Sequence, residues 1–431
     1  MASGPRITIP LDIPDVRVLK TERTPEGEYI VTVESTVTTT PCRRCGRILT
    51  EVHGLDEPRR LRHLAIFGSP VYIQIRPKRF RCLVCDGPST TTQRLDWYDA
   101  QACHTKAYER HLIVQLINTT LSDVVAKEDV SYDALLGILD RWVATTVVWD
   151  RIAPFSVLGI DEIALTKGRR NFVAVVTARS AAGSVSILAV LPDRLKATVA
   201  AWLRSMPAAQ RAQITTVCTD MWDGYVSAVQ EEVPHALIVI DRFHVARHYR
   251  NAVDELRKQE VRRLQRELPQ AQRHDLKRTV WLVRKDPDDL TDDEQAHLAT
   301  LFTYSPALQQ AYALREELTA IFDTARSKAD GLRRIQLWRQ RVARSDLACF
   351  DTFLTLLDTW LDHIANYFID HQTSSFVEGL NTKLKVLKRR CYGLRNLERL
   401  FQRLTLDVSG YRWFSPWQPD TTTYGPAHGN S

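Results

Sequence analysis

Apolar residues recur along the chain with two different spacings, and the spacing predicts where strands give way to helices. From residue 155 to residue 241, short apolar runs bounded by polar residues predict five strands. Two runs, Asn171–Ala178 and Val185–Leu191, are almost entirely apolar, as expected of strands covered on both faces. Helical patterns follow the third and fourth runs, so the predicted order is βββαβαβ. The strands are expected at residues 155–165, 171–178, 185–191, 214–220 and 236–241, and the helices at residues 193–206 and from residue 223.

This order matches a ribonuclease-H-like fold, in which an antiparallel meander of three strands continues into parallel strands joined by crossover helices. We therefore expect an α/β catalytic core that begins at residues 151–245. Residues 246–372 have a helical pattern too long for a loop and are expected to form an all-helical insertion of about five helices. The core is expected to resume at residues 373–412, and residues 413–431, rich in Pro, Gly, Thr and Ser, to form a disordered tail.

Inside the insertion, a few residues predict local structure. Thr291 and Glu294 have the spacing of a capping box at the start of a helix. Trp281, Trp338 and Trp360 are expected to pack the core of the insertion, because large aromatic side chains are mostly buried.

The stretch after the insertion predicts a helix from Ser375 to about Arg390. Val377, Leu380, Leu384 and Leu387 recur at helical spacing and form one apolar stripe. The opposite face carries a carboxylate, an amide, a hydroxyl and cations, contributed by Glu378, Asn381, Thr382, Lys385 and Arg389. Such a face could hold a metal ion beside a phosphate backbone. Taken alone, Ser375 and Glu378 also match a capping box, in which Glu378 would only satisfy a backbone amide. A further helix is expected from Leu397 to Asp407.

Before the core, residues 1–100 predict a small β-rich domain with a zinc ribbon. Strand-like alternation occurs at residues 29–38 and 71–76. Four cysteines form two C-x2-C pairs, and each pair can supply two thiolates to one tetrahedral Zn²⁺. The ligands are expected to be Cys42, Cys45, Cys82 and Cys85. Many arginines crowd this domain, among them Arg43 and Arg44, which suggests contact with phosphates, although a solvated basic face is the alternative.

Residues 101–150 predict three helices, at 106–117, 121–127 and 132–143, with Ser131 capping the third. A short helix, a turn and a further helix suit a helix-turn-helix domain, whose last helix would enter the major groove of DNA. Plain helical bundles show the same pattern. Tyr132, Asp133 and Arg141 are the outward residues of the third helix to test, and Tyr132 and Arg141 are the two that we expect to contact DNA.

Composition narrows the class of partner. The chain has 431 residues, 44% of them hydrophobic, which is enough for two or three domains with cores of their own. Its formal net charge is +7 and its pI is about 9.0, which favours an acidic partner such as nucleic acid. The eight cysteines do not suggest a disulfide framework, and no signal core or membrane-spanning run is apparent, so we expect a reduced, cytoplasmic protein that does not enter a membrane. Cys103, Cys218, Cys349 and Cys391 are expected to be buried by default.

Two aspartates in the predicted core carry candidate chemistry. Asp161 lies within an apolar strand, where a charge is costly unless it is paired or bound to a metal. Asp220 ends the fourth strand, which neighbours the first in this topology. Two adjacent carboxylates repel each other, and a divalent cation relieves that conflict. With Glu378 as the third ligand, the site predicts two Mg²⁺ ions about 3.5 to 4 Å apart.

Other residues compete for these roles. Asp223 follows closely but suits the N-cap of a helix. Asp241 ends the fifth strand and could replace Asp220 as a ligand, although that strand is one further from the first. His244 is expected near the mouth of the site, packed or in contact with a phosphate rather than as a catalytic base.

Taken together, the motifs resemble a known family. The cysteine pairs, the three-helix pattern and four short motifs are similar to bacterial insertion-sequence transposases of the ISL3 type. The motifs are GIDE at Gly159–Glu162, TDMWDGY at Thr219–Tyr225, IDRFHV at Ile240–Val245 and EGLNTKLKVLKRRCYGLRN at Glu378–Asn396. The resemblance covers nearly the whole chain, and the last motif is its most specific part.

The resemblance implies a DDE transposase whose catalytic acids are Asp161, Asp220 and Glu378, with Mg²⁺ or Mn²⁺ as cofactor and structural Zn²⁺ on the cysteines. It implies binding to double-stranded DNA, both terminal inverted repeats and target, as a homodimer or larger assembly in the bacterial cytoplasm at the nucleoid. Phosphates beside the cut are expected to meet Lys383, Lys385, Lys388, Arg389 and Arg390. A DNA-binding regulator that does not cut, or a structure-specific nuclease of the same fold, is the alternative.

Overall fold

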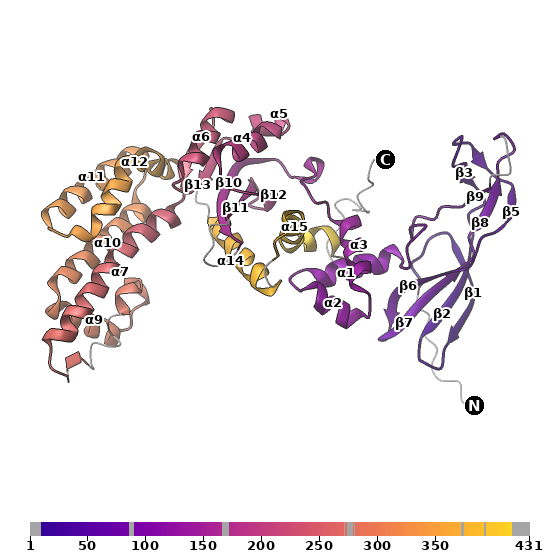
Figure 1. Cartoon of the computed structure of the whole chain (residues 1–431), viewed down its shortest axis with the longest axis horizontal. Helices are drawn as coiled ribbons and strands as arrows, with labels where there is room; N and C mark the ends of the chain where they lie inside the picture. Colours follow the sequence, from indigo (N-terminus) through magenta and orange to yellow (C-terminus); the bar gives the residue numbers. More distant parts are fainter. Residues whose placement is uncertain are drawn as a thin grey trace. The chain divides into compact units, whose positions relative to one another are not determined.

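The computed structural model describes residues 10–85, 90–165, 172–270, 272–273, 279, 281–371, 375–391 and 394–415, and for residues 375–381 and 388 it describes the backbone alone. The chain forms two compact units. One comprises Met1–Val143 and the end of the chain from Gly410, and the other comprises Ala144–Ser409. The elements of both are labelled in Figure 1.

The first unit contains a four-stranded sheet in the order β1-β2-β7-β6. Its strands are β1 (Val16–Arg23), β2 (Tyr29–Ser35), β6 (Arg59–Ile66) and β7 (Ser69–Ile75). The predictions of strands at residues 29–38 and 71–76 are therefore confirmed, with ends shifted by one to three residues. β2 and β7 pair in parallel, with Val31 opposite Ile73. Alternate residues of both strands enter a core with Trp97.

Shorter strands carry the cysteine pairs of the same unit. β3 (Thr40–Pro41) pairs with β4 (Ile48–Leu49), and β5 (Val52–Leu55), β8 (Lys78–Arg81) and β9 (Thr90–Thr92) form a three-stranded sheet. Cys42 and Cys45 lie in the turn between β3 and β4, while Cys82 and Cys85 follow β8.

Three helices complete the first unit, at the predicted places: α1 (Lys106–Leu116), α2 (Leu121–Glu128) and α3 (Tyr132–Trp142). Side-chain oxygens cap each of them, from Thr105, Thr120 and the predicted Ser131. Asp129, with a φ of 50°, ends α2 in the left-handed region, which is the predicted break before α3.

The second unit contains a five-stranded sheet in the order β12-β11-β10-β13-β14. Its strands are β10 (Phe155–Ala164), β11 (Phe172–Ser180), β12 (Val185–Leu191), β13 (Thr216–Thr219) and β14 (Leu237–Ile240). β10, β11 and β12 form an antiparallel meander, and β13 and β14 continue it in parallel. The predicted order of strands and helices is confirmed, and β14 is one strand further from β10 than β13 is.

Helices cover both faces of this sheet. On one face lie α4 (Lys196–Ser205) and α6 (Asp223–Glu232), packed on Leu158, Ile160 and their neighbours. A short helix, α5 (Ala208–Ala212), follows α4. The prediction that α4 begins at Asp193 was wrong by three residues. The carboxylate of Asp193 instead accepts a hydrogen bond from the backbone N–H of Leu195, which forms a turn ahead of the helix.

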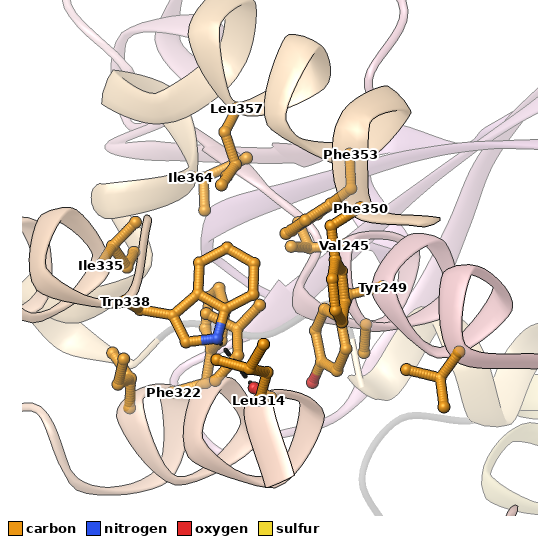
Figure 2. Packing of buried hydrophobic residues seen from close by; sticks show 14 of the residues in the cluster. Val245, Tyr249, Leu314, Phe322, Ile335, Trp338, Phe350, Phe353, Leu357 and Ile364 are labelled. Carbon is orange, nitrogen blue, oxygen red and sulfur yellow. Dashed lines mark hydrogen bonds between the residues drawn. The ribbon is translucent and has the colours of Figure 1, made fainter. Parts of the chain in front are cut away.

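The helical region after β14 has its own core and also packs on the sheet. Its helices are α7 (Arg242–Glu267), α9 (Asp292–Tyr304), α10 (Pro306–Thr324), α11 (Lys328–Arg344), α12 (Asp351–Ala365) and α13 (Tyr367–Asp370), with short 3-10 turns at Leu282–Arg284, Pro287–Asp289 and Ala348–Phe350. Trp338 is fully buried at the centre, as Figure 2 shows, and its indole N–H donates to the carbonyl of Leu314. The predicted capping box at Thr291 and Glu294 is confirmed.

The two other tryptophans differ from the prediction in degree. Trp360 is only partly buried at the edge of this core. Trp281 is 55% exposed, so the prediction for it was wrong. Its ring instead lies against the guanidinium groups of Arg257 and Arg284, which accounts for an aromatic side chain at the surface.

The last two helices, α14 (Ser375–Arg390) and α15 (Leu397–Phe414), return to the sheet. Leu384 and Leu387 of α14 pack on β10, β11 and β12 together with Leu400 and Phe401 of α15. α15 continues past Asp407, where the sequence placed its end, and Phe414 is buried against Trp142 in the first unit. Residues 416–431, most of the predicted tail, lie outside the described residues.

Candidate active site

Three aspartates lie side by side at one edge of the five-stranded sheet. In the parallel register, Ile160 pairs with Thr219 and Thr219 pairs with Ile240. The next residues along the three strands are Asp161, Asp220 and Asp241. Because residues at matching positions of parallel strands lie side by side, the three aspartates form a row, which we call the acidic row. Asp161 lies inside β10, whereas Asp220 and Asp241 directly follow β13 and β14.

Asp220 is the most perturbed member of the row. Burial raises the pKa of Asp220 to about 7, His244 opposes this shift, and the negative charges of Asp161 and Glu162 add to it. Its Oδ1 is buried and has no hydrogen-bond partner among the described residues. A buried carboxylate oxygen without a partner is costly. The donor set therefore fits a divalent cation with oxygen ligands, such as Mg²⁺, at this place.

His244 faces the row from the first turn of α7. Its Nε2 lies 3.8 Å from Oδ2 of Asp161 and 3.9 Å from Oδ2 of Asp241. Burial alone would lower the pKa of His244, but the carboxylates of Asp161, Asp241 and Asp220 outweigh it and raise the pKa. The three carboxyl groups therefore favour the protonated form of this imidazole.

Asp241 has a second role as well as its place in the row. Its Oδ1 accepts a hydrogen bond of 3.0 Å from the backbone N–H of Phe243 and so caps α7. Asp223, in contrast, does not cap α6 as expected. It is the first residue of that helix, and Trp222 occupies the cap position without a side-chain hydrogen bond.

The opposite face of β10 supports the loop that follows Asp220. Glu162 points away from Asp161, as the pleat requires, and pairs with Arg194 at 2.7 Å. The guanidinium of Arg194 lies over the ring of Trp222, 3.9 Å from its centre, and the Trp222 indole donates to the Arg194 carbonyl. These contacts fix the residues directly after Asp220. Nothing in the sequence points to Arg194, because its contacts with Trp222 depend on how α4 and α6 pack.

The helix that carries Glu378 packs on the same face of the sheet as the acidic row. Leu384 and Leu387 contact Val173 and Val175, and Val175 pairs directly with Asp161 in the antiparallel register. The side chain of Glu378, and with it the alternative that Glu378 only caps the helix, lies outside the described residues, as does that of Lys388.

The remaining cations of α14 divide into two groups. Arg390 forms an ion pair of 2.7 Å with Asp407 of α15, and Lys383 donates to the carbonyl of Asp407. Lys385 and Arg389 are exposed. The first pair therefore joins two helices, whereas the second pair faces solvent and stays available to a ligand.

The four cysteines of the first unit converge on one point. Their sulfur atoms all lie within 4.8 Å of one another, and the Cys42–Cys85 and Cys45–Cys82 separations are both 3.8 Å. Four thiolates around Zn²⁺, with bonds of about 2.3 Å, have sulfur separations of about 3.8 Å. Within the described part of the chain, no other set of three or more candidate ligands is drawn together as closely.

Local backbone geometry prepares two of these thiols. Backbone N–H groups of the turn lower the pKa of Cys42 to about 6, and those of Val84 and Cys85 lower the pKa of Cys82. The neighbouring sulfurs raise the pKa of Cys85 to about 12. Four thiolates this close together would repel one another, and a bound cation such as Zn²⁺ would offset that repulsion.

The other predicted DNA contacts of the first unit have different surroundings. Arg43 and Arg44 are exposed in the turn between β3 and β4, and Tyr132 is 48% exposed on α3. Arg141 instead pairs with the buried Glu109 of α1, which also accepts from the indole of Trp142. Arg141 therefore has a part in joining α3 to α1.

Two expectations about the rest of the chain can be compared with the structure. Cys218 is buried and Cys349 and Cys391 are partly buried, but Cys103 is exposed, so the default for it was wrong. Among the described residues, every helix is too short or too polar to cross a lipid bilayer.

Comparison with known proteins identifies a matching family and similar proteins. The model of a family described as transposase, of the DDE and ISL3 type, matches residues 158–404. The chain is 28% identical over 383 residues to the transposase for insertion sequence element IS1001 of Bordetella parapertussis, covering 86% of this chain and 89% of that protein. It is 26% identical over 394 residues to the transposase for insertion sequence element IS1557 of Mycobacterium tuberculosis, covering 86% of each.

Proposed function

The chain belongs to the ISL3 family of DDE transposases, and on that premise we propose that it binds the terminal inverted repeats of an insertion sequence, cuts DNA at their ends and joins the freed strand to a target. The second unit is the catalytic part in this proposal, with a ribonuclease-H-like core interrupted by the helices between β14 and α14. The strand order β12-β11-β10-β13-β14 and its mixed directions support that assignment.

One observation carries the proposal. Asp161 and Asp220 occupy adjacent register positions on the neighbouring parallel strands β10 and β13, and Asp220 has a buried oxygen without a partner in the described structure. Asp161, Asp220 and Glu378 would hold divalent cations there, Mg²⁺ or Mn²⁺, and these supply activation of the attacking water or 3′-hydroxyl and stabilisation of the leaving oxygen.

The protein's own residues have distinct tasks at this site. The carboxyl group of Asp220 must lose its proton to serve as a ligand, and its raised pKa means that cation binding releases a proton near neutral pH. Asp241 caps α7 rather than completing the ligand set, so we assign it a positioning role. His244 is positioned to donate to a phosphate oxygen at the edge of the row.

The first unit would bind the inverted repeats. The exposed Arg43 and Arg44 lie next to a cysteine cluster that we propose holds structural Zn²⁺, and α2 and α3 would act as a helix-turn-helix with Tyr132 facing DNA. Lys385 and Arg389 of α14 would hold phosphates beside the cut. Lys383 and Arg390 were expected to do the same, but they join α14 to α15 through Asp407. Lys388, whose side chain lies outside the described residues, stays a predicted phosphate contact. Two ends must be brought together, which requires at least a dimer on DNA.

An assay of strand cleavage and strand joining on inverted-repeat DNA tests the proposal. The parent chain is expected to cut and join only with Mg²⁺ or Mn²⁺, and Glu378→Gln is expected to abolish both steps while leaving end binding intact. Glu398→Gln is the matched control, because Glu398 is an exposed glutamate of α15 that lies outside the acidic row. A chain that binds ends without cutting would be a regulator, and one that cuts without joining would be a nuclease; either result refutes the proposal.

A further inference from the structure

The first helix after β14 turns one face toward solvent directly beside the acidic row. Val245 and Tyr249 of α7 enter the core around Trp338, as Figure 2 shows. Phe243, Arg247 and Arg250 lie on the other side of the helix, because positions two or five residues from a buried one fall nearly opposite to it. α7 begins one residue after Asp241, so this face starts at the row.

One cation on this face stands out because it has no acidic partner. Other cations of α7 are held in ion pairs, Arg257 with Asp254 and Arg263 with Glu260. Arg247 is exposed and makes no ion pair or hydrogen bond with the described residues. Its positive charge, together with that of His244, lowers the pKa of His248 after burial has done so. The surroundings of Arg247 are therefore positive and open to an anion.

An exposed aromatic ring lies between Arg247 and the row. Phe243 is 44% exposed, and its ring meets the imidazole of His244 edge-on at 5.8 Å. His244 in turn lies 3.8 Å from Asp161. A large apolar ring in solvent costs free energy unless a ligand covers it, and the face of a nucleic-acid base is a suitable cover.

Further along the same face, α7 borders an arginine-lined cavity of about 310 Å³. Arg250 and Asn251 line it from α7, and Arg284 and Arg315 line it from the adjoining segments. Arg315 is only 4% exposed, and its guanidinium is held by the carbonyls of Val283 and Lys285. Asp254 also lines the cavity, but Arg257 and Arg284 already neutralise it. Each of its arginines has an acidic partner, Arg250 in Asp286, Arg284 in Asp254 and Arg315 in Glu316, so the cavity itself carries little net charge.

We propose that this face of α7 binds a single DNA strand as it leaves the acidic row, with Phe243 stacked on a base and Arg247 on a backbone phosphate. Arg250 would exchange its exposed ion pair with Asp286 for a second phosphate. The inference rests on the proposed function and adds a binding surface to it. From Phe243 to Arg250 the helix rises about 10 Å, or about three nucleotide steps of 3.4 Å. Proteins that hold a single DNA strand regardless of its sequence usually combine arginines with aromatic rings that stack on the bases. An acidic protein partner would not require the aromatic ring.

Two variants and one control test this surface. Phe243→Ala and Arg247→Ala are each expected to lower the cleavage rate about tenfold, with the melting temperature and duplex end binding unchanged. Phe243→Trp should restore cleavage, because it restores stacking. Arg344→Ala, which removes another exposed arginine of the same helical region, should leave cleavage within twofold of the parent.

A direct binding measurement separates this inference from the proposed function. Fluorescence anisotropy with a labelled inverted-repeat duplex that ends in a short single-stranded overhang needs no cutting. Arg247→Ala should weaken binding of the overhang DNA about fivefold and lower its salt dependence by about one phosphate contact, while a blunt duplex binds as before. If both variants bind and cut like the parent, the inference is wrong and the proposed function stands. If the parent does not cut but the overhang effect persists, the proposed function fails and the strand surface remains.

Discussion

The molecule carries two candidate metal sites that are built in opposite ways. The cysteine cluster takes its ligands from two short turns 37 to 43 residues apart, and its sulfurs already lie within 4.8 Å of one another. The acidic row takes Asp161 and Asp220 from two strands, and the proposed third ligand, Glu378, comes from a helix about half the chain further on. Among the described residues, the row is not drawn as close as the thiols.

The difference reflects what each site must do. A structural metal site gains from closed coordination, since binding free energy becomes folding free energy. A site that must admit water and a phosphodiester cannot be closed by its own ligands, and carboxylates that repel one another keep it ready for a cation. The cysteine cluster should therefore matter mainly for folding and end binding, and the acidic row mainly for chemistry.

The largest expected effect is the loss of strand cleavage when a carboxylate of the acidic row is removed. Asp161→Asn removes one charge from the carboxylate pair and should lower strand cleavage by about 10³-fold or more, because catalytic groups that act together fail together. Zinc content and end binding should equal those of the parent. A variant that cut at a tenth of the parental rate would remove Asp161 from the ligand set.

The next effect concerns the cysteine cluster. Cys82→Ser removes one thiolate from a four-thiolate site and should cost the chain its zinc, measured by metal analysis, and about 100-fold in end binding. Thermal unfolding of the second unit should stay as in the parent. Cys103→Ser is the control, because that exposed cysteine lies outside the cluster. Retention of both zinc and end binding in Cys82→Ser would contradict the assignment.

A smaller effect is the pH dependence of thermal stability that Asp220 should cause. The folded-state pKa of Asp220 is raised from about 3.8 to about 7, so the folded chain binds a proton that the unfolded chain loses at lower pH. Without divalent cations, stability should therefore fall as pH rises from about 4 to about 7, and the melting temperature should drop by a few °C. The melting temperature of the Asp220→Asn variant should change less with pH over this range. Equal pH profiles for the two chains would show that Asp220 does not titrate as described.

The smallest expected effect comes from Arg194, which lies outside the acidic row and positions the residues after Asp220. Arg194→Ala removes the stack on Trp222 and the ion pair with Glu162, and it should lower cleavage about fivefold through looser placement of Asp220. Lys196→Ala, two residues along, loses only an exposed ion pair and should leave cleavage unchanged. A similar loss in both variants would indicate a general effect on α4.

Sequence reasoning reached the strands, their order and most helix starts because these depend on local signals. Ser131 and the pair Thr291 and Glu294 show this, since a cap is set by residues within one turn. It also placed Asp161 and Asp220 on neighbouring strands, because the order of elements determines which strands pair.

The residues whose surroundings differ from the sequence-based predictions depend on packing between distant segments. Asp241 was weighed as a substitute ligand, and only the register showed that it lies in the row while also capping α7. Trp281 was expected inside because of its size, yet two arginines cover it at the surface. Arg141 was assigned to DNA from its place on α3, whereas a buried glutamate on another helix holds it.

The double use of Asp241 has a mechanical consequence. One of its oxygens fixes the start of a 26-residue helix, and the other faces the same imidazole that Asp161 faces. A helix of this length spans about 39 Å from its cap, and its buried residues from Val245 to Leu264 tie it to the core of the helical region. The packing of that region and the position of Asp241 in the acidic row are therefore set by one and the same helix.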